Sequence, residues 1–376
     1  MALLLAAGGG AQAQTPPRLV SGGPNQGQST IATTPHANDF DTRKTSPGVV
    51  RWFDFDSTAQ LGGGYGANVG VLPGTSTRPV IDNSVKASGA GSLRFDVPSL
   101  SGPNAAGAWW ANFSPDLLTQ FGENSQFFIQ WRQRFNQAFI DTYVLDASGG
   151  APQGGIKQVD VVTGDRPGRI YNSCEALETV IQTYYQYRFP IVYNSCTGSG
   201  SHSAYAGLYE TTPSFDYLLQ NARPVPGCTY TQTHATGIAS TVNAPPGCFA
   251  WEADEWMTFQ IGITLGPRDN VNKDFLDSRV QFWAAREGRS SQLLLDWKPG
   301  VRGYFPLAAG PPSDNQKFGK VWLLPYMTNK NPKQSHGLMQ TWYDEVIIST
   351  QRIPDPTLSS TAMPSTPSAS PHLPGP

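Results

Sequence analysis

Residues 127–135 alternate apolar and polar side chains, and this alternation constrains the fold more than any other feature of the chain. One face of the expected strand carries the apolar side chains Phe127, Ile129, Trp131 and Phe135. The other face carries an amide and two guanidinium groups about 7 Å apart: Gln130, Arg132 and Arg134. A strand with one buried and one polar face is typical of an antiparallel sheet, and such a polar row suits an acidic polymer. The alternative is that the arginines are ordinary solvated charges.

Short strand candidates of the same kind recur along the chain, bounded by turn-forming residues. They cover residues 50–55, 92–97, 127–135, 156–162, 177–187, 256–265, 279–286, 292–297, 320–327 and 342–349. Only residues 115–121 read as a helical turn. Many strands without alternating helices predict an all-β fold, a two-sheet antiparallel β-sandwich of the jelly-roll type with long loops pinned by disulfides.

The two ends of the chain differ in composition from its middle. Residues 1–13 join an apolar run to small residues, which is typical of a signal peptide, although no Lys or Arg precedes the run and a flexible start is the alternative. We expect a flexible leader over residues 14–48, the jelly-roll domain over 49–353, and a disordered Pro/Ser/Thr-rich tail over 354–376. Export predicts a secreted or periplasmic protein.

All four cysteines fall in the middle third of the chain: Cys174, Cys196, Cys228 and Cys248. An even count suits disulfides in an oxidising compartment, and pairing each cysteine with its nearest neighbour in sequence gives two short loops. Four cysteines allow three pairings, and all three stay open at this point. Zinc is a weaker alternative because the sequence has no Cys-x-x-Cys pair.

The charge balance excludes several function classes. With 26 basic and 28 acidic residues, the 376-residue chain has a net charge of −2, which gives no field to attract a nucleic acid. No apolar run approaches the 18 or so residues that span a membrane. The chain also lacks a phosphate-binding loop, a Gly-x-Ser-x-Gly elbow and a His-Glu-x-x-His pair. We expect a monomer without a cofactor, with calcium at Asp344 and Glu345 as the minor alternative.

Further polar and aromatic side chains lie on or next to the expected strands, namely Lys157, Gln182, Tyr184, Trp322, Tyr326, Lys330 and His336. The chain resembles the concanavalin A-like jelly rolls and, more loosely, the polysaccharide lyases that cleave alginate or glucuronan. This resemblance rests on the strand at 342–349, the segment 88–95, and the arginine-bearing strand followed by the Gly-Gly-x-Lys segment at 154–157. It covers residues 50–353 as scattered strand signatures.

The resemblance implies β-elimination on a uronic acid, in which one group neutralises the carboxylate, a base takes the C5 proton and an acid protonates the leaving oxygen. The implied catalytic residues are Arg132 and Gln182 for the carboxylate, with Tyr184, Tyr326 and His336 for the proton transfers. The implied binding residues are Gln130, Arg134, Lys157, Trp322 and Lys330. We expect the binding and catalytic side chains to converge in one groove across the concave sheet. The sequence departs from the alginate-lyase pattern, since it has Arg132-Gln-Arg134 in place of Arg-x-Glu-x-Arg. A non-catalytic carbohydrate-binding or surface structural protein of the same fold is the alternative.

Overall fold

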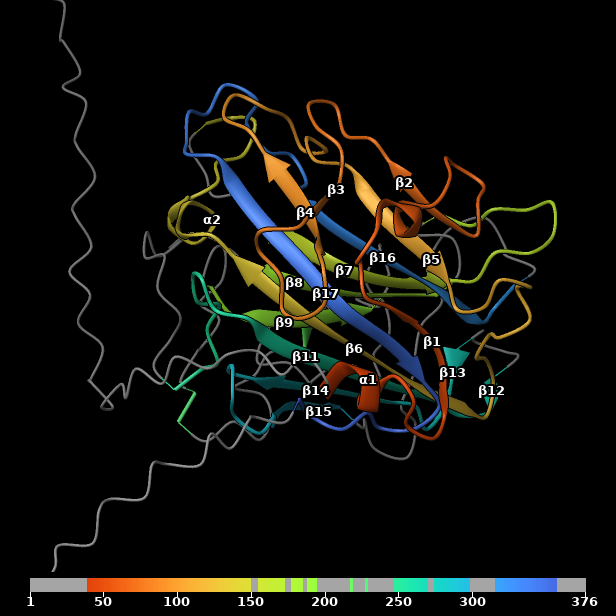
Figure 1. Cartoon of the computed structure of the whole chain (residues 1–376). Helices are drawn as coiled ribbons and strands as arrows, with labels where there is room; N and C mark the ends of the chain where they lie inside the picture. The colour runs from red at the N-terminus through yellow and green to blue at the C-terminus, as the bar shows by residue number, and fades with distance from the viewer. Residues whose placement is uncertain are drawn as a thin grey trace, which may run out of the picture. The chain divides into compact units, whose positions relative to one another are not determined.

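The computed structural model describes residues 39–149, 155–172, 177–184, 188–194, 217–218, 227–228, 247–269, 274–297 and 315–356. Within these residues the chain forms two antiparallel sheets, which Figure 1 shows as two layers. Short helices are few: α1 (Asp39–Arg43), α2 (Gln137–Asp141) and the 3-10 turn η1 (Thr58–Leu61). No helix among the described residues is long and apolar enough to cross a membrane.

Sheet A has the strand order β15-β14-β11-β6-β17-β4-β3, with β1 paired to β17. In that order its strands are β15 (Gln292–Trp297), β14 (Arg279–Ala285), β11 (Met257–Leu265), β6 (Ser125–Phe135), β17 (Met339–Ser349), β4 (Ser92–Val97), β3 (Val80–Asp82) and β1 (Val49–Phe53). The long strands β6, β11 and β17 form the centre of this sheet.

Sheet B has the strand order β10-β9-β8-β7-β16-β5-β2. Its strands are β10 (Tyr217–Leu218), β9 (Pro190–Asn194), β8 (Glu178–Tyr184), β7 (Gly155–Thr163), β16 (Phe318–Tyr326), β5 (Ala108–Asn112) and β2 (Val69–Leu72). A separate pair joins β12 (Arg268–Asp269) to β13 (Asp274–Phe275). Sequence neighbours such as β5 and β6 lie in different sheets, as a jelly roll requires.

The core lies between the inner faces of the two sheets. The alternation of β6 places Phe127, Ile129 and Trp131 in this core, and β16 contributes Val321 and Leu323 from the other sheet. Polar contacts also cross the interior, because the Gln133 amide donates to Gln158 Oε1 at 2.9 Å. The predicted two-sheet antiparallel sandwich is therefore confirmed.

Buried residues occur at both ends of the described domain. Phe40 and Arg43 of α1 are buried, although the sequence placed them in a flexible leader. At the other end Ile353 is buried, and its backbone N–H donates to Gln260 Oε1 at 2.8 Å. The helical turn predicted at residues 115–121 is wrong: the chain makes turns there, with Leu117 at a φ of 62°.

Candidate functional site

Lys157 lies at the centre of the outer face of sheet B, the face turned away from sheet A. Ile156, Val159 and Val161 point into the core, and an irregularity between Lys157 and Val159 brings both Lys157 and Asp160 to the outer face. In the strand register Lys157 is opposite Gln182 on β8 and Tyr326 on β16. Three side chains that the sequence analysis proposed as site residues therefore lie on neighbouring strands.

Two phenol rings flank the Lys157 ammonium. Its Nζ atom lies 5.9 Å from the ring centroid of Tyr193 and also 5.9 Å from that of Tyr326. A side-chain hydrogen bond joins Lys157 to Tyr193, yet burial outweighs it and raises the pKa of the Tyr193 hydroxyl well above its ordinary value. Tyr193 is thus held in its protonated, hydrogen-donating form.

Sequence reasoning missed Tyr193. It lies on β9 (Pro190–Asn194), where the sequence analysis named no strand because residues 189–250 lack clear alternation of apolar and polar side chains. The short run Ile191-Val192-Tyr193 was the available signal, since β-branched and aromatic residues favour strands. Tyr184, which was predicted instead, pairs through its backbone with Gly155, and its side chain lies outside the described residues.

Two buried carboxyl groups lie beside Lys157. Its Nζ atom is 4.0 Å from Asp160 Oδ2 and 3.9 Å from Glu178 Oε1. Burial opposes the charged ammonium, but Asp160, Tyr193 and Glu178 outweigh burial and raise the pKa of Lys157. Burial and the nearby Asp160 raise the pKa of Glu178 to about 8, against the lowering effect of Lys157. Lys157 is therefore a cation, and Glu178 holds a proton near neutral pH.

An aromatic row continues across the same face toward β2. The rings of Trp322 and Trp110 lie 5.7 Å apart with an interplanar angle of 32°, and Tyr65 follows at 6.4 Å from Trp110. Gly70 is required beneath this row, because a Cβ atom there would lie 2.4 Å from Trp110 Cζ2. Trp110 is buried, whereas Tyr65 is exposed and Trp322 is partly exposed, so these two rings offer flat apolar surface next to the polar cluster.

Lys320, another lysine on this face, bonds groups of the protein itself. It is completely buried, and its Nζ atom donates to Asp165 Oδ1 at 2.5 Å and to the Tyr171 carbonyl. Asn112 also donates to Asp165, at 2.8 Å. These contacts fasten the segment after β7 to the sheet, so Lys320 has a structural role beside the site.

The structure places Gln130, Arg132 and Arg134 on the outer face of sheet A, and it does not bring them together with Lys157. Gln130 is fully buried and bonds Arg43 and the Pro354 carbonyl. The two arginines pair with acids of their own sheet, Arg132 with Glu287 and Arg134 with Asp254. The expectation that these residues share a groove with Gln182 and Tyr326 is wrong, because β6 and β8 belong to different sheets.

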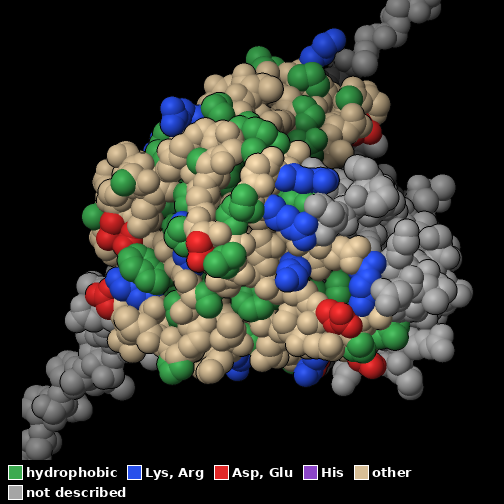
Figure 2. Space-filling view, turned by 90° about the vertical axis from the view of Figure 1, so that its right-hand side faces the viewer, with side chains coloured by type: hydrophobic (Ala, Val, Ile, Leu, Met, Phe, Trp, Pro, Cys, Tyr) green, Lys and Arg blue, Asp and Glu red, His purple; other side chains and the backbone are tan. Residues whose placement is uncertain are grey.

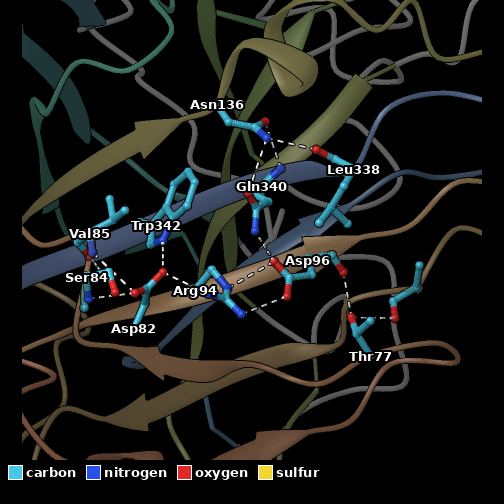
Figure 3. Close-up of polar contacts among 12 residues, drawn as sticks. Thr77, Asp82, Ser84, Val85, Arg94, Asp96, Asn136, Leu338, Gln340 and Trp342 are labelled. Carbon is cyan, nitrogen blue, oxygen red and sulfur yellow. Dashed lines mark hydrogen bonds and ion pairs between the residues drawn. The ribbon is translucent and has the colours of Figure 1, made fainter.

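Another part of the outer face of sheet A carries polar side chains that bond one another (Figure 3). Arg94 lies between two acids, at 2.9 Å from Asp82 Oδ2 and 3.1 Å from Asp96 Oδ1. The Trp342 indole N–H donates to Asp82 Oδ2 at 2.9 Å, and the Gln340 amide donates to Asp96 Oδ1 at 2.8 Å. These bonds link β3, β4 and β17, so the network has a structural role.

The loop between β16 and β17 holds Lys330 and His336. Lys330 is buried, and its Nζ atom donates to the Ser101 carbonyl at 2.5 Å. Burial lowers the pKa of His336, whose Nδ1 lies 2.6 Å from the Gly337 carbonyl oxygen. No contact among the described residues joins either side chain to Lys157, so their predicted site roles gain no geometric support.

The cysteine and calcium predictions have separate outcomes. Cys228 and Cys248 form a disulfide, as nearest-neighbour pairing predicts, while Cys174 and Cys196 lie outside the described residues.

Asp344, one of the two residues proposed for calcium, is buried and accepts from the Ala87 backbone N–H at 2.8 Å, and burial raises its pKa well above the ordinary value. Glu345 pairs with Arg43. No group of three potential metal ligands occurs among the described residues.

Surface charge is mixed on the face of the molecule that Figure 2 draws. Figure 2 shows basic and acidic side chains interspersed with neutral ones on one face of the molecule, without a continuous field of one sign. This agrees with the net charge of −2. Any acidic ligand must therefore be recognised by a local arrangement such as the one around Lys157.

No family model and no curated protein matches the sequence. Among solved structures, the chain is similar to an alginate lyase from Aplysia kurodai, at 9% identity and a TM-score of 0.47, covering 81% of this chain and 99% of that one. It is also similar to an alginate lyase from a Chlorella virus, at 12% identity and a TM-score of 0.39, covering 80% of this chain and 99% of that one. A third similar structure is an endo-β-1,4-glucuronan lyase from Trichoderma reesei, at 13% identity and a TM-score of 0.39, covering 81% of this chain and 96% of that one. We transfer no residue role at these identities.

Proposed function

We propose that the protein binds a uronate-containing polysaccharide on the outer face of sheet B and cleaves it by β-elimination. The observation that carries this proposal is the position of the Lys157 ammonium between two phenols, 5.9 Å from each ring centroid, with Gln182 as its register partner. A fixed cation, an amide and two hydroxyl groups are the side chains that such a reaction needs in one place.

The proposed roles follow from the charge state of each group. Removing the C5 proton builds negative charge on the uronate carboxylate, and the Lys157 cation with the Gln182 amide stabilises that charge. Tyr193 keeps its proton because burial raises its pKa, so it suits the acid that protonates the leaving oxygen. Tyr326, on the other side of the ammonium, is then the proposed base that takes the C5 proton.

The two acids beside Lys157 do not forbid an anionic substrate. Because the pKa of Glu178 is about 8, that group is mostly neutral at pH 7. Burial also raises the pKa of Asp160, against the lowering effect of Lys157, so the cluster repels a uronate carboxylate less than it would with both acids ionised. This charge state predicts that substrate binding weakens at alkaline pH, when Glu178 loses its proton.

A carbohydrate-binding protein without catalysis is the second candidate. The row of Trp322, Trp110 and Tyr65 supports it, since aromatic faces stack on sugar rings without any proton transfer. This candidate needs the aromatic row and Gln182, whereas the lyase also needs Tyr326 and Tyr193.

The experiment is the ultraviolet absorbance of the unsaturated uronate formed on alginate, glucuronan and pectin. We expect absorbance on one of these polymers, and Tyr326→Phe should lower kcat by about 10²- to 10⁴-fold, the usual contribution of a positioned base. Arg134→Gln on sheet A is the control and should keep the wild-type rate. No absorbance on any polymer, together with retained oligosaccharide binding, would favour the binding protein.

A further inference from the structure

Trp322 and Asp160 face each other across the β16–β7 strand pair. They are direct register partners on the outer face of sheet B, and Trp322 is also the register partner of Trp110. Side chains paired in this way have Cβ atoms about 5 Å apart. The indole and the carboxyl group therefore border the same small area of the sheet, between the aromatic row and Lys157.

Each of the two side chains has a polar atom without a partner among the described residues. These atoms are Asp160 Oδ1 and Trp322 Nε1, and both are buried. Asp160 is only 2% exposed, and its other oxygen is the one 4.0 Å from Lys157 Nζ. An unsatisfied buried polar group is costly, so the two atoms call for an explanation.

Three other tryptophans of the fold bond their indole N–H groups to the protein, whereas the buried Trp251 has no partner for its indole N–H among the described residues. The indole N–H groups of Trp109, Trp110 and Trp342 donate to Gln60 O, Ala67 O and Asp82 Oδ2, at 2.9, 3.1 and 2.9 Å. The fold thus provides acceptors for these three buried indoles. Trp322 instead presents a free donor beside a free acceptor.

A hydroxyl group satisfies both atoms at once, because it carries one donor and two acceptor positions. We propose that Asp160 and Trp322 form a subsite that binds one ring hydroxyl of a pyranose and selects the substrate by the orientation of that hydroxyl. The indole N–H donates to the hydroxyl oxygen, and the hydroxyl donates to Asp160 Oδ1. The ring stacks on the partly exposed Trp322, which packs beside Trp110 with ring centroids 5.7 Å apart. The inference rests on the proposed function, since it gives that face its specificity.

β-1,4-linked glucuronan and polymannuronate are a matched pair of ligands, because their sugars differ only in the orientation of the C2 hydroxyl. A subsite built to bond a hydroxyl discriminates strongly against a ligand that leaves its polar groups unpaired. We expect wild-type protein to bind tetrasaccharides of the two polymers with affinities that differ about tenfold or more, the equivalent of one unpaired buried group.

The test is calorimetric binding of both tetrasaccharides to Trp322→Phe, which keeps an aromatic ring and removes the N–H donor. The ratio of the two affinities should fall to within about twofold. The matched control is Trp342→Phe, which removes an indole N–H on sheet A and should leave the ratio unchanged (Figure 3). Thermal unfolding separates the two variants further, since only Trp342→Phe loses a hydrogen bond of the fold.

An unchanged ratio in Trp322→Phe would overturn the subsite, as would equal affinity of wild-type protein for both ligands. Failure of Trp322→Phe to fold would also overturn it, because the indole would then serve packing. The elimination assay reports separately on the proposed function. If the protein catalyses elimination but the affinity ratio is unchanged in Trp322→Phe, the lyase proposal stands and the subsite is wrong. If the affinity ratio falls in Trp322→Phe but no elimination occurs, the subsite stands and the lyase proposal is wrong.

Discussion

Lys157 Nζ lies 3.9 Å from Glu178 Oε1 and so links β7 to β8 on the outer face of sheet B. One ammonium serves two buried acids here, because Asp160 Oδ2 is 4.0 Å from the same atom. A single cation cannot balance two carboxylates, and burial together with Asp160 raises the pKa of Glu178 to about 8. The face therefore holds one proton that exchanges near neutral pH.

The first prediction concerns stability against pH at Glu178. Its folded pKa of about 8 is above the ordinary value of 4.5, so between these values the native state binds more protons than the unfolded state. The free energy of unfolding must then fall as pH rises, by at most about 1.4 kcal/mol per pH unit. Glu178→Gln should flatten the curve between pH 5 and 8, as measured by urea unfolding. Parallel curves for the two proteins would contradict this.

The second prediction concerns Lys157. Lys157→Met leaves Asp160 and Glu178 without their cation, and breaking a buried ion pair costs about 3 kcal/mol. We expect lower stability in urea and no elimination on any uronate polymer, whereas Lys157→Arg keeps the charge and should restore most of the stability. The exposed Lys333→Met is the control and should match wild type in both assays. Wild-type stability in Lys157→Met would show that the cluster is not electrostatically coupled.

Sequence reasoning predicts the inside and outside of strands well, because burial imposes a period of two. The alternation in β6 put Phe127, Ile129 and Trp131 in the core, and the structure confirms it. Alternation does not say which of the two sheets a strand joins. Gln130 and Gln182 were expected in one groove, yet they lie on the outer faces of different sheets.

Alternation also does not reveal what covers an outer face. Gln130 is fully buried because Arg43, 87 residues earlier in the chain, donates to its Oε1 at 2.6 Å. Contacts of such long range depend on topology, which the local pattern does not contain. Tyr193 was missed for a related reason, since its five-residue strand lies in a stretch without clear strand alternation.

The third prediction follows from that covering contact. Arg43 is 2% exposed and holds Gln130 and Glu345 beneath α1. Arg43→Ala leaves the buried Glu345 with Arg132, 3.7 Å away, in place of its close ion pair, and should lower the free energy of unfolding by about 3 kcal/mol. Oligosaccharide binding should not change, since this contact is on sheet A. Arg289→Ala, at an exposed position, is the control for removing a charge. A loss of binding in folded Arg43→Ala would contradict the assignment of the site to sheet B.

The fourth prediction concerns the disulfide between Cys228 and Cys248, which closes a loop with a sequence separation of 20. The residues after Cys248 are tied to the core, because Phe249 and Trp251 pack on Phe259 with ring centroids 6.0 and 4.8 Å away. In the chain-entropy account, closing a loop of this size stabilises the fold by about 3 kcal/mol. The double variant Cys228→Ser/Cys248→Ser should have a free energy of unfolding that is lower by that amount, as measured by urea unfolding. Adding reductant should then change its unfolding midpoint less than that of wild type, since this bond is already absent. Equal stability of the variant and wild type would show that contacts such as Phe249 on Phe259 hold this segment without the bond.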